Sequence, residues 1–191
     1  MTDLINPDQG ILFMKVGVHA KEPLESIIER KSREIEEAGF ALWGYGGNTC
    51  HPTTMVQPFA RKFSDEKGGI ILCMHEMDSK HFAEQVRAEY FSIDGQKWEY
   101  VPQQINVMGS RFALAIKALR QEEFTLPLAR TRVAIGNSQG RPGDQYIAGR
   151  VDKACLELSE NAAGPLDPEE PKIQISLVAD LCDPYAVFLK N

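Results

Sequence analysis

The sequence predicts an α/β fold: a mixed β-sheet with helices packed on it and α+β character in the second half. Strand-like apolar segments alternate with helical patterns over residues 10–75, whereas Asp94-Gly95 marks an antiparallel hairpin. The composition, 43% hydrophobic and 25% charged, is that of a globular protein, and 191 residues suit one domain. We therefore expect a single globular domain over residues 1–191.

The chain begins with an expected strand and its clearest helix. Residues 11–19 start as an apolar run, which is typical of a strand covered on both faces. Pro23 suits the first turn of a helix over 22–38, and Gly39 suits its left-handed end. One face of this helix carries residues at helical spacing: Leu24, Ile27, Ile28, Lys31 and Ile35.

Two further strands complete the first half. Residues 40–45 form the second strand, and a turn-rich loop follows over 46–52. A weaker helix over 53–65 is interrupted by Pro58, and residues 70–75 read as a buried strand. This β-α-β-α-β order favours parallel strands joined by right-handed crossovers.

The second half opens with a hairpin. Segments 86–93 and 97–101 flank the Asp94-Gly95 turn and are expected to pair in antiparallel fashion. Ser110 then stands where it can cap a helix over 111–121.

A short strand over 132–135 leads into a polar, glycine-rich loop over 136–143. Asp144 stands where it can cap another helix. The face of that helix is expected to carry Ile147, Val151, Cys155 and Leu158.

The chain closes with an acidic, proline-containing loop over 159–171, expected to be exposed and mobile. Two strands, 173–179 and 186–189, should form a final hairpin around Asp183-Pro184.

Charge and composition limit the compartment and the partners. The net charge is −6, which argues against nucleic acid as a partner, although residues 104–153 carry +4 and could hold a small anion. No apolar run approaches the roughly 20 residues of a membrane-spanning helix, and the N-terminus lacks a signal-peptide pattern. The four widely spaced cysteines, of which Cys73 and Cys155 are expected to be buried, do not resemble a disulfide framework. We expect a cytoplasmic protein that is not bound to a membrane.

Histidines follow each of the first three predicted strands. His19, His51 and His75 lie at or just beyond the strand ends, and His81 is close enough in sequence to join them. The carboxyl ends of parallel strands share one edge of a sheet, where open α/β sheets bind ligands. The sequence therefore predicts a site at that edge.

Two chemistries suit these residues, beside a purely structural role for each histidine. His19, His51 and His75 could bind Zn²⁺ or a similar divalent metal. Alternatively, Cys50 could act as a nucleophile, with His51 or His75 as its base and Glu76 handling protons. Neither spacing is diagnostic, because residues 75–81 do not form the H-E-x-x-H motif.

Two glycine-rich loops suggest what the ligand is. Trp43 and Tyr45 share one side of an extended chain and could stack on a flat ligand such as a nucleobase, unless they serve only as core. The following segment carries Gly46 and Gly47, which allow close backbone approach, and Asn48, a further candidate for contact with the ligand. In the loop over 136–143, Arg141 could meet an anion, although the loop matches no phosphate-binding motif.

Two functions from different classes follow. The first is a small-molecule site for an anionic or nucleotide-like ligand, with or without catalysis, at the carboxyl edge of the sheet. The second is a non-catalytic interaction or regulatory protein that acts through homo-oligomerisation at an exposed strand edge or through a protein partner. In that case the loop over 159–171 and the Asp94-Gly95 hairpin would offer the surfaces.

Overall fold

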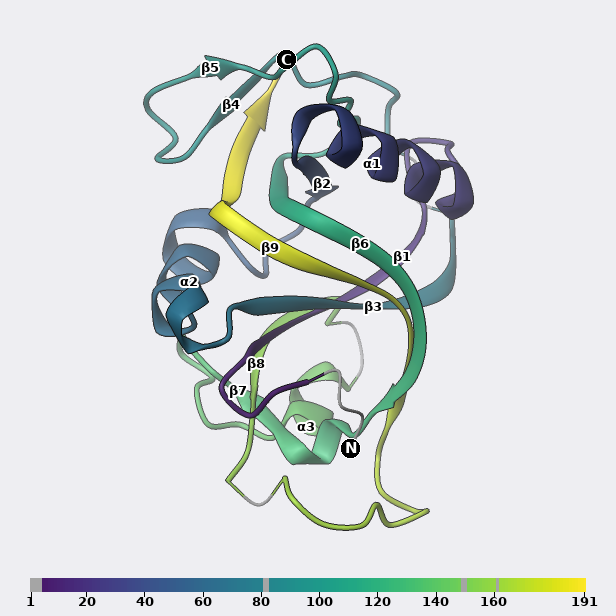
Figure 1. Cartoon of the computed structure of the whole chain (residues 1–191), viewed down its shortest axis with the longest axis vertical. Coiled ribbons are helices and arrows are strands. Elements are labelled where there is room, and N and C mark those ends of the chain that lie inside the picture. The colour runs from purple at the N-terminus through teal and green to yellow at the C-terminus, as the bar shows by residue number, and fades with distance from the viewer. Residues whose placement is uncertain (1–4, 81–82, 149–150, 161) are drawn as a thin grey trace.

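The computed structural model describes residues 5–80, 83–148, 151–160 and 162–191, and these form one mixed β-sheet with helices packed against it (Figure 1). The strands are β1 (Gly10–Val18), β2 (Ala41–Tyr45), β3 (Ile70–Lys80), β4 (Tyr90–Ser92), β5 (Glu99–Tyr100), β6 (Phe112–Leu126), β7 (Thr131–Val133), β8 (Lys153–Leu158) and β9 (Ile173–Lys190). The α-helices are α1 (Leu24–Ala38), α2 (Gln57–Lys62) and α3 (Gly143–Ile147). The short helical turns are η1 (Pro52–Val56), η2 (Asp65–Lys67) and η3 (Leu128–Arg130). The predicted α/β class is confirmed.

The strand order is β2-β6-β9-β3-β1-β8-β7. Outside this order, β4 pairs with both β5 and β9. β1 and β3 pair in parallel, as the alternating pattern predicts. β2 does not join them: it lies at the edge and pairs antiparallel with β6. The later strands β6 and β9 fill the space between β2 and β3, which no pattern in the first half of the sequence could indicate.

The two long strands bend the sheet strongly. β6 and β9 run side by side along a curved path in Figure 1, and their register shifts at three places. One core cluster accordingly joins residues that are distant in the strand order, among them Met14 of β1, Trp43 of β2 and Leu114 of β6. This curvature brings the β2 edge and the end of β1 to a common pocket.

Two predicted helices are wrong. Residues 112–121 belong to β6, and Ser110 caps no helix. The run from Phe112 to Ile116 is buried throughout, because β2 and β9 pair with its two edges. Burial in the centre of a sheet overrides the helical propensity of its alanines and leucines.

The helix expected from Asp144 is only one turn of α3. Pro142 precedes it, and no side chain caps it. Cys155 and Leu158 lie instead on β8, whose six residues are all buried against β1 and β7. Short apolar runs of this kind do not distinguish a buried strand from a helix.

The expected closing hairpin is also wrong, because residues 173–190 form one continuous strand, β9. The Asp183-Pro184 peptide is cis and lies inside this strand. β6 pairs with β9 on both sides of that point.

The loop over 159–171 is largely exposed, as expected, but Arg130 anchors it. The Arg130 guanidinium donates hydrogen bonds to the carbonyl oxygens of Ala162, Gly164 and Pro165. It also pairs with the Glu170 carboxylate at 2.7 Å, which holds the pKa of that carboxyl below its ordinary value. Residues 162–170 are therefore held beside η3 by this one side chain.

Other elements are confirmed. α1 ends at Gly39, which adopts φ 82° as expected, and η1 with α2 replaces the weaker helix. β4 and β5 form the predicted hairpin around Asp94-Gly95.

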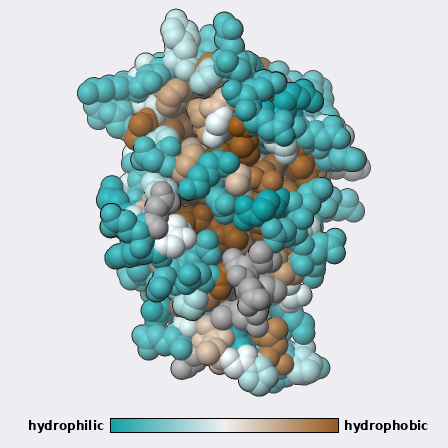
Figure 2. Space-filling view, in the orientation of Figure 1, coloured by the Kyte–Doolittle hydropathy of each residue, from teal (hydrophilic) through white to brown (hydrophobic). Residues whose placement is uncertain are grey.

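Figure 2 shows a face with hydrophilic side chains around its rim and hydrophobic ones gathered toward the middle. Among the described residues, no helix combines the length and the apolar character needed to cross a membrane.

Candidate functional site

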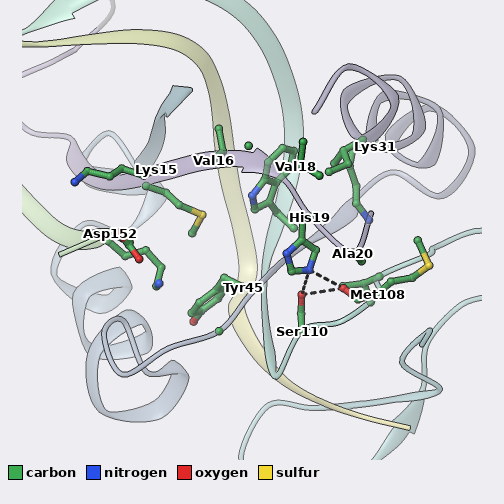
Figure 3. Close-up of a pocket in the computed structure, with 18 of the residues that line it drawn as sticks. Lys15, Val16, Val18, His19, Ala20, Lys31, Tyr45, Met108, Ser110 and Asp152 are labelled. Atoms are coloured by element: carbon green, nitrogen blue, oxygen red, sulfur yellow. Dashed lines mark hydrogen bonds between the residues drawn. The ribbon is translucent and has the colours of Figure 1, made fainter. Parts of the chain in front are cut away.

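A pocket of about 370 Å³ opens at the carboxyl ends of β1 and β2. Its walls come from the end of β1, the end of β2 with the glycines after it, the inner face of α1, the segment 106–110, and Asp152 and Lys153 at the start of β8. Lys15 and Asp152 lie at one end of the pocket, and Lys31 and Met108 lie at the other (Figure 3). A volume in this range is typical of small-molecule sites.

A buried polar network builds the wall between α1 and the segment 106–110. Glu34 accepts hydrogen bonds from Lys31 Nζ at 2.8 Å, from Arg30 Nη1 at 3.1 Å and from the Asn106 backbone N–H at 2.9 Å. Lys31 Nζ also donates to the Asn106 carbonyl at 2.7 Å, and Arg30 donates to the same oxygen. Lys31 and Glu34 are each 2% exposed. The network fixes α1 against this segment, while the buried Asn106 Oδ1 has no partner in the described part of the chain.

Burial changes the proton affinity of Lys31. Desolvation lowers its pKa from 10.5 to about 8, and attraction by Glu34 offsets only part of this. Between pH 8 and 10.5 the unfolded chain binds more protons at this position than the folded chain. The contribution of Lys31 to the free energy of unfolding therefore rises with pH through that window and is least favourable below pH 8.

We expect the ¹³Cε resonance of Lys31 to titrate near pH 8 in NMR spectra of the folded protein. Lys31→Met would assign the resonance by its loss, and exposed Lys67 is the internal reference. Over pH 8 to 10.5 the stability of the parent should also rise relative to Lys31→Met. A Lys31 midpoint above pH 10 would contradict the expected desolvation.

His19 closes one side of the pocket. Its Nε2 lies 2.9 Å from the Met108 carbonyl and 3.1 Å from Ser110 Oγ, which itself donates to that carbonyl. The three groups converge in Figure 3. Because a carbonyl only accepts, Nε2 is the donor in the bond to Met108. His19 thus ties the end of β1 to the segment before β6.

The opposite end of the pocket carries Lys153, a cation that forms no ion pair with the described residues. Lys153 is 8% exposed, and its Nζ lies 6.0 Å from the centre of the Tyr45 ring. No carboxylate or carbonyl in the described ranges pairs with this Nζ. Lys15 and exposed Asp152 also line this end, so two lysines face one aspartate and the end keeps a net positive charge. This end therefore favours an anion.

The aromatic residues predicted to bind a ligand do line the pocket. Trp43 and Tyr45 point to the same side of β2 and are 5% and 4% exposed, so they also belong to the core. Gly46 and Gly47 line the pocket beside them. Asn48 is exposed and lies outside the lining.

The residues predicted to be catalytic are not gathered in the pocket. Cys50 is 1% exposed, and its Sγ contacts Cys155 Sγ at 3.8 Å. The His51 ring packs edge-on against Phe112 and Phe188.

The other two predicted catalytic residues lie on β3, outside the pocket. His75 Nδ1 donates to the Gln174 carbonyl at 2.7 Å, and Glu76 lines a separate surface depression. The structure shows no thiol–imidazole pair among these described residues.

The predicted metal set does not converge either. His19, His51 and His75 have the separate partners given above, and the described residues contain no group of three or more metal-ligating side chains. His81 lies outside the described residues. Arg141 is exposed beside α3, where it donates to the Gln145 carbonyl and does not line the pocket.

Sequence reasoning missed the charged residues of the pocket. Lys31 interrupts the apolar face of α1, a signal that could have indicated a buried cation. Lys153 was missed because its segment was assigned to a helix. On the strand β8, Lys153 and Cys155 lie on the same face. Asn106 gave no signal of its own.

Comparison with known proteins gives no assignment: no family model matches the chain, and neither curated proteins nor solved structures match it significantly.

Proposed function

We propose that this protein binds a small anionic ligand with a flat ring, such as a nucleoside monophosphate, in the pocket between β1, β2 and α1. Lys153 carries the proposal: this residue is only 8% exposed, lines the pocket and forms no ion pair in the described part of the chain. Burying an unpaired charge costs stability. A bound anion would supply the missing counter-charge, which explains why a destabilising group is retained at this position.

The rest of the pocket supports the same ligand class. Trp43 and Tyr45 offer aromatic surface next to this cation, and Gly46 and Gly47 bring backbone close to the bound molecule. Lys15 adds a second positive charge. The proposal concerns binding alone, since the predicted nucleophile Cys50 does not line the pocket.

The test compares AMP with uncharged adenosine by thermal unfolding and calorimetry. We expect AMP at 100 times its Kd to raise the Tm of the parent by roughly 5–10 °C, with a smaller shift for adenosine. Lys153→Met should weaken AMP binding by roughly 10- to 100-fold, because a hydrogen bond to a charged group is lost. Without ligand this variant should be as stable as the parent or more so, because an unpaired buried charge is removed.

Lys67→Met is the matched control, since Lys67 is exposed and does not line the pocket. It should bind AMP as the parent does. Equal AMP affinity in Lys153→Met and the parent would refute the proposed role of this cation.

An exposed aromatic cluster favours the second candidate function, an interaction protein. Tyr100 of β5 is 74% exposed and stacks on Tyr90 at 4.9 Å, and Ile93 at the hairpin turn is 47% exposed. Exposed apolar groups on an edge hairpin are typical of contact surfaces. If no anionic probe shifts the Tm of the parent, this candidate becomes the preferred one.

A further inference from the structure

Two cysteines that are far apart in sequence meet behind the pocket. Cys50 Sγ and Cys155 Sγ lie 3.8 Å apart across 105 positions of sequence, and each residue is 1% exposed. A disulfide needs the sulfur atoms at about 2.05 Å, so the two side chains must approach each other for the bond to form. The other two described cysteines lie elsewhere: Cys73 packs in a different core cluster, and Cys182 is half-buried.

The two partners differ in how firmly the fold holds them. Cys155 lies in the middle of β8, paired with β1 at Leu12, and its carbonyl accepts from the Ala134 N–H. Cys50 lies in the loop after β2, with φ 56°, a conformation that non-glycine residues rarely adopt. The Tyr45 hydroxyl donates to the Cys50 carbonyl at 2.6 Å. Closure would therefore move the loop toward a fixed strand.

Each of the two cysteines lies on a chain segment that also contributes to the pocket wall. Gly46 and Gly47 start the loop that carries Cys50, and Lys153 lies two residues before Cys155 on the same face of β8. Tyr45 contacts both sides, since its ring lies near Lys153 Nζ and its hydroxyl bonds to Cys50. A bond between the cysteines would tie the glycine loop to the strand that supplies the pocket cation.

We propose that Cys50 and Cys155 form a reversible dithiol–disulfide pair that is oxidised by hydrogen peroxide. One sulfur attacks a peroxide oxygen, the O–O bond breaks, and a sulfenic acid and water form. The second sulfur then attacks the sulfenic sulfur, the S–S bond forms, the S–O bond breaks and a second water leaves. The two thiols lose two electrons, the peroxide gains them, and both thiol protons end in water.

The environment of the pair slows its oxidation, because both thiols are buried. The hydrogen bond to Cys50, followed by burial, raises the pKa of the Cys155 thiol well above its ordinary value. A protonated thiol is a poor nucleophile. Oxidation should therefore be slow near pH 7 and faster at alkaline pH, where the thiolate is more populated.

The experiment uses the full chain, reduced, freed of reductant and treated with hydrogen peroxide. It is then alkylated and digested without reduction for mass spectrometry. Before alkylation, we expect the mass of the intact protein to fall by two hydrogen atoms. After digestion, we expect one cross-linked pair of peptides that contains Cys50 and Cys155. Two of the four thiols should escape alkylation, and dithiothreitol should restore both. Detection by mass does not depend on ligand binding, so this proposal stands or falls separately from the pocket ligand.

Cys182→Ser is the matched control and should keep the cross-link, whereas Cys155→Ala should lose it. If Cys155→Ala does not fold, the peptide map of the parent decides alone. The proposal is overturned if Cys50 and Cys155 remain alkylatable, carry added oxygen without a bond, or pair with Cys73 or Cys182.

Discussion

Glu34→Ala is expected to lower the free energy of unfolding by about 3–5 kcal/mol at pH 7, the cost of breaking a buried ion pair from one side. The substitution removes the acceptor of Lys31, Arg30 and the Asn106 N–H together. It leaves the Lys31 ammonium 2% exposed with only the Asn106 carbonyl as partner. Urea or thermal unfolding would measure the loss.

The pH dependence distinguishes this mechanism from a simple loss of packing. Glu34 supports the charged form of Lys31, so the pKa of Lys31 should fall below 8 in Glu34→Ala. The destabilisation should then be smaller at pH 9 than at pH 6, where the isolated ammonium must stay charged. Glu36→Ala is the control on the same helix, because Glu36 is exposed, and it should change stability by less than about 0.5 kcal/mol. Equal effects of the two substitutions would show that the network does not hold α1.

The parts of the fold that follow from local pattern were predictable. α1 has an apolar stripe, a proline at its start and a glycine at its end, and each signal acts within a few residues. The hairpin around Asp94-Gly95 is equally local. Elements whose identity depends on distant partners were not predictable. β6 has a helix-like composition and becomes a strand only because β2 and β9 lie on its two sides.

The site shows the same division. His19, Trp43 and Tyr45 line the pocket, and their positions at strand ends and on one strand face follow from local alternation. Lys153 enters the pocket through the pairing of β8 with β1, a contact between opposite ends of the chain. The meeting of Cys50 with Cys155 depends on the same pairing. A site whose residues are brought together by the pairing of distant strands has no characteristic spacing of those residues in the sequence.

Gly44→Ala should destabilise the protein by about 1–3 kcal/mol, and thermal unfolding should show a Tm lowered by roughly 3–10 °C. A Cβ at this position would lie 2.9 Å from both Ser110 Cβ and Val107 Cγ2, closer than side chains pack. The segment 107–110 would have to move from β2, which would also strain the contact between Ser110 and His19. Gly46→Ala is the control two residues away, where an added Cβ meets no atom within 4 Å. It should match the parent or gain slightly, since alanine restricts the unfolded chain. If the two variants are equally stable, the segment 107–110 does not pack tightly on β2, and the pocket wall is looser than the structure indicates.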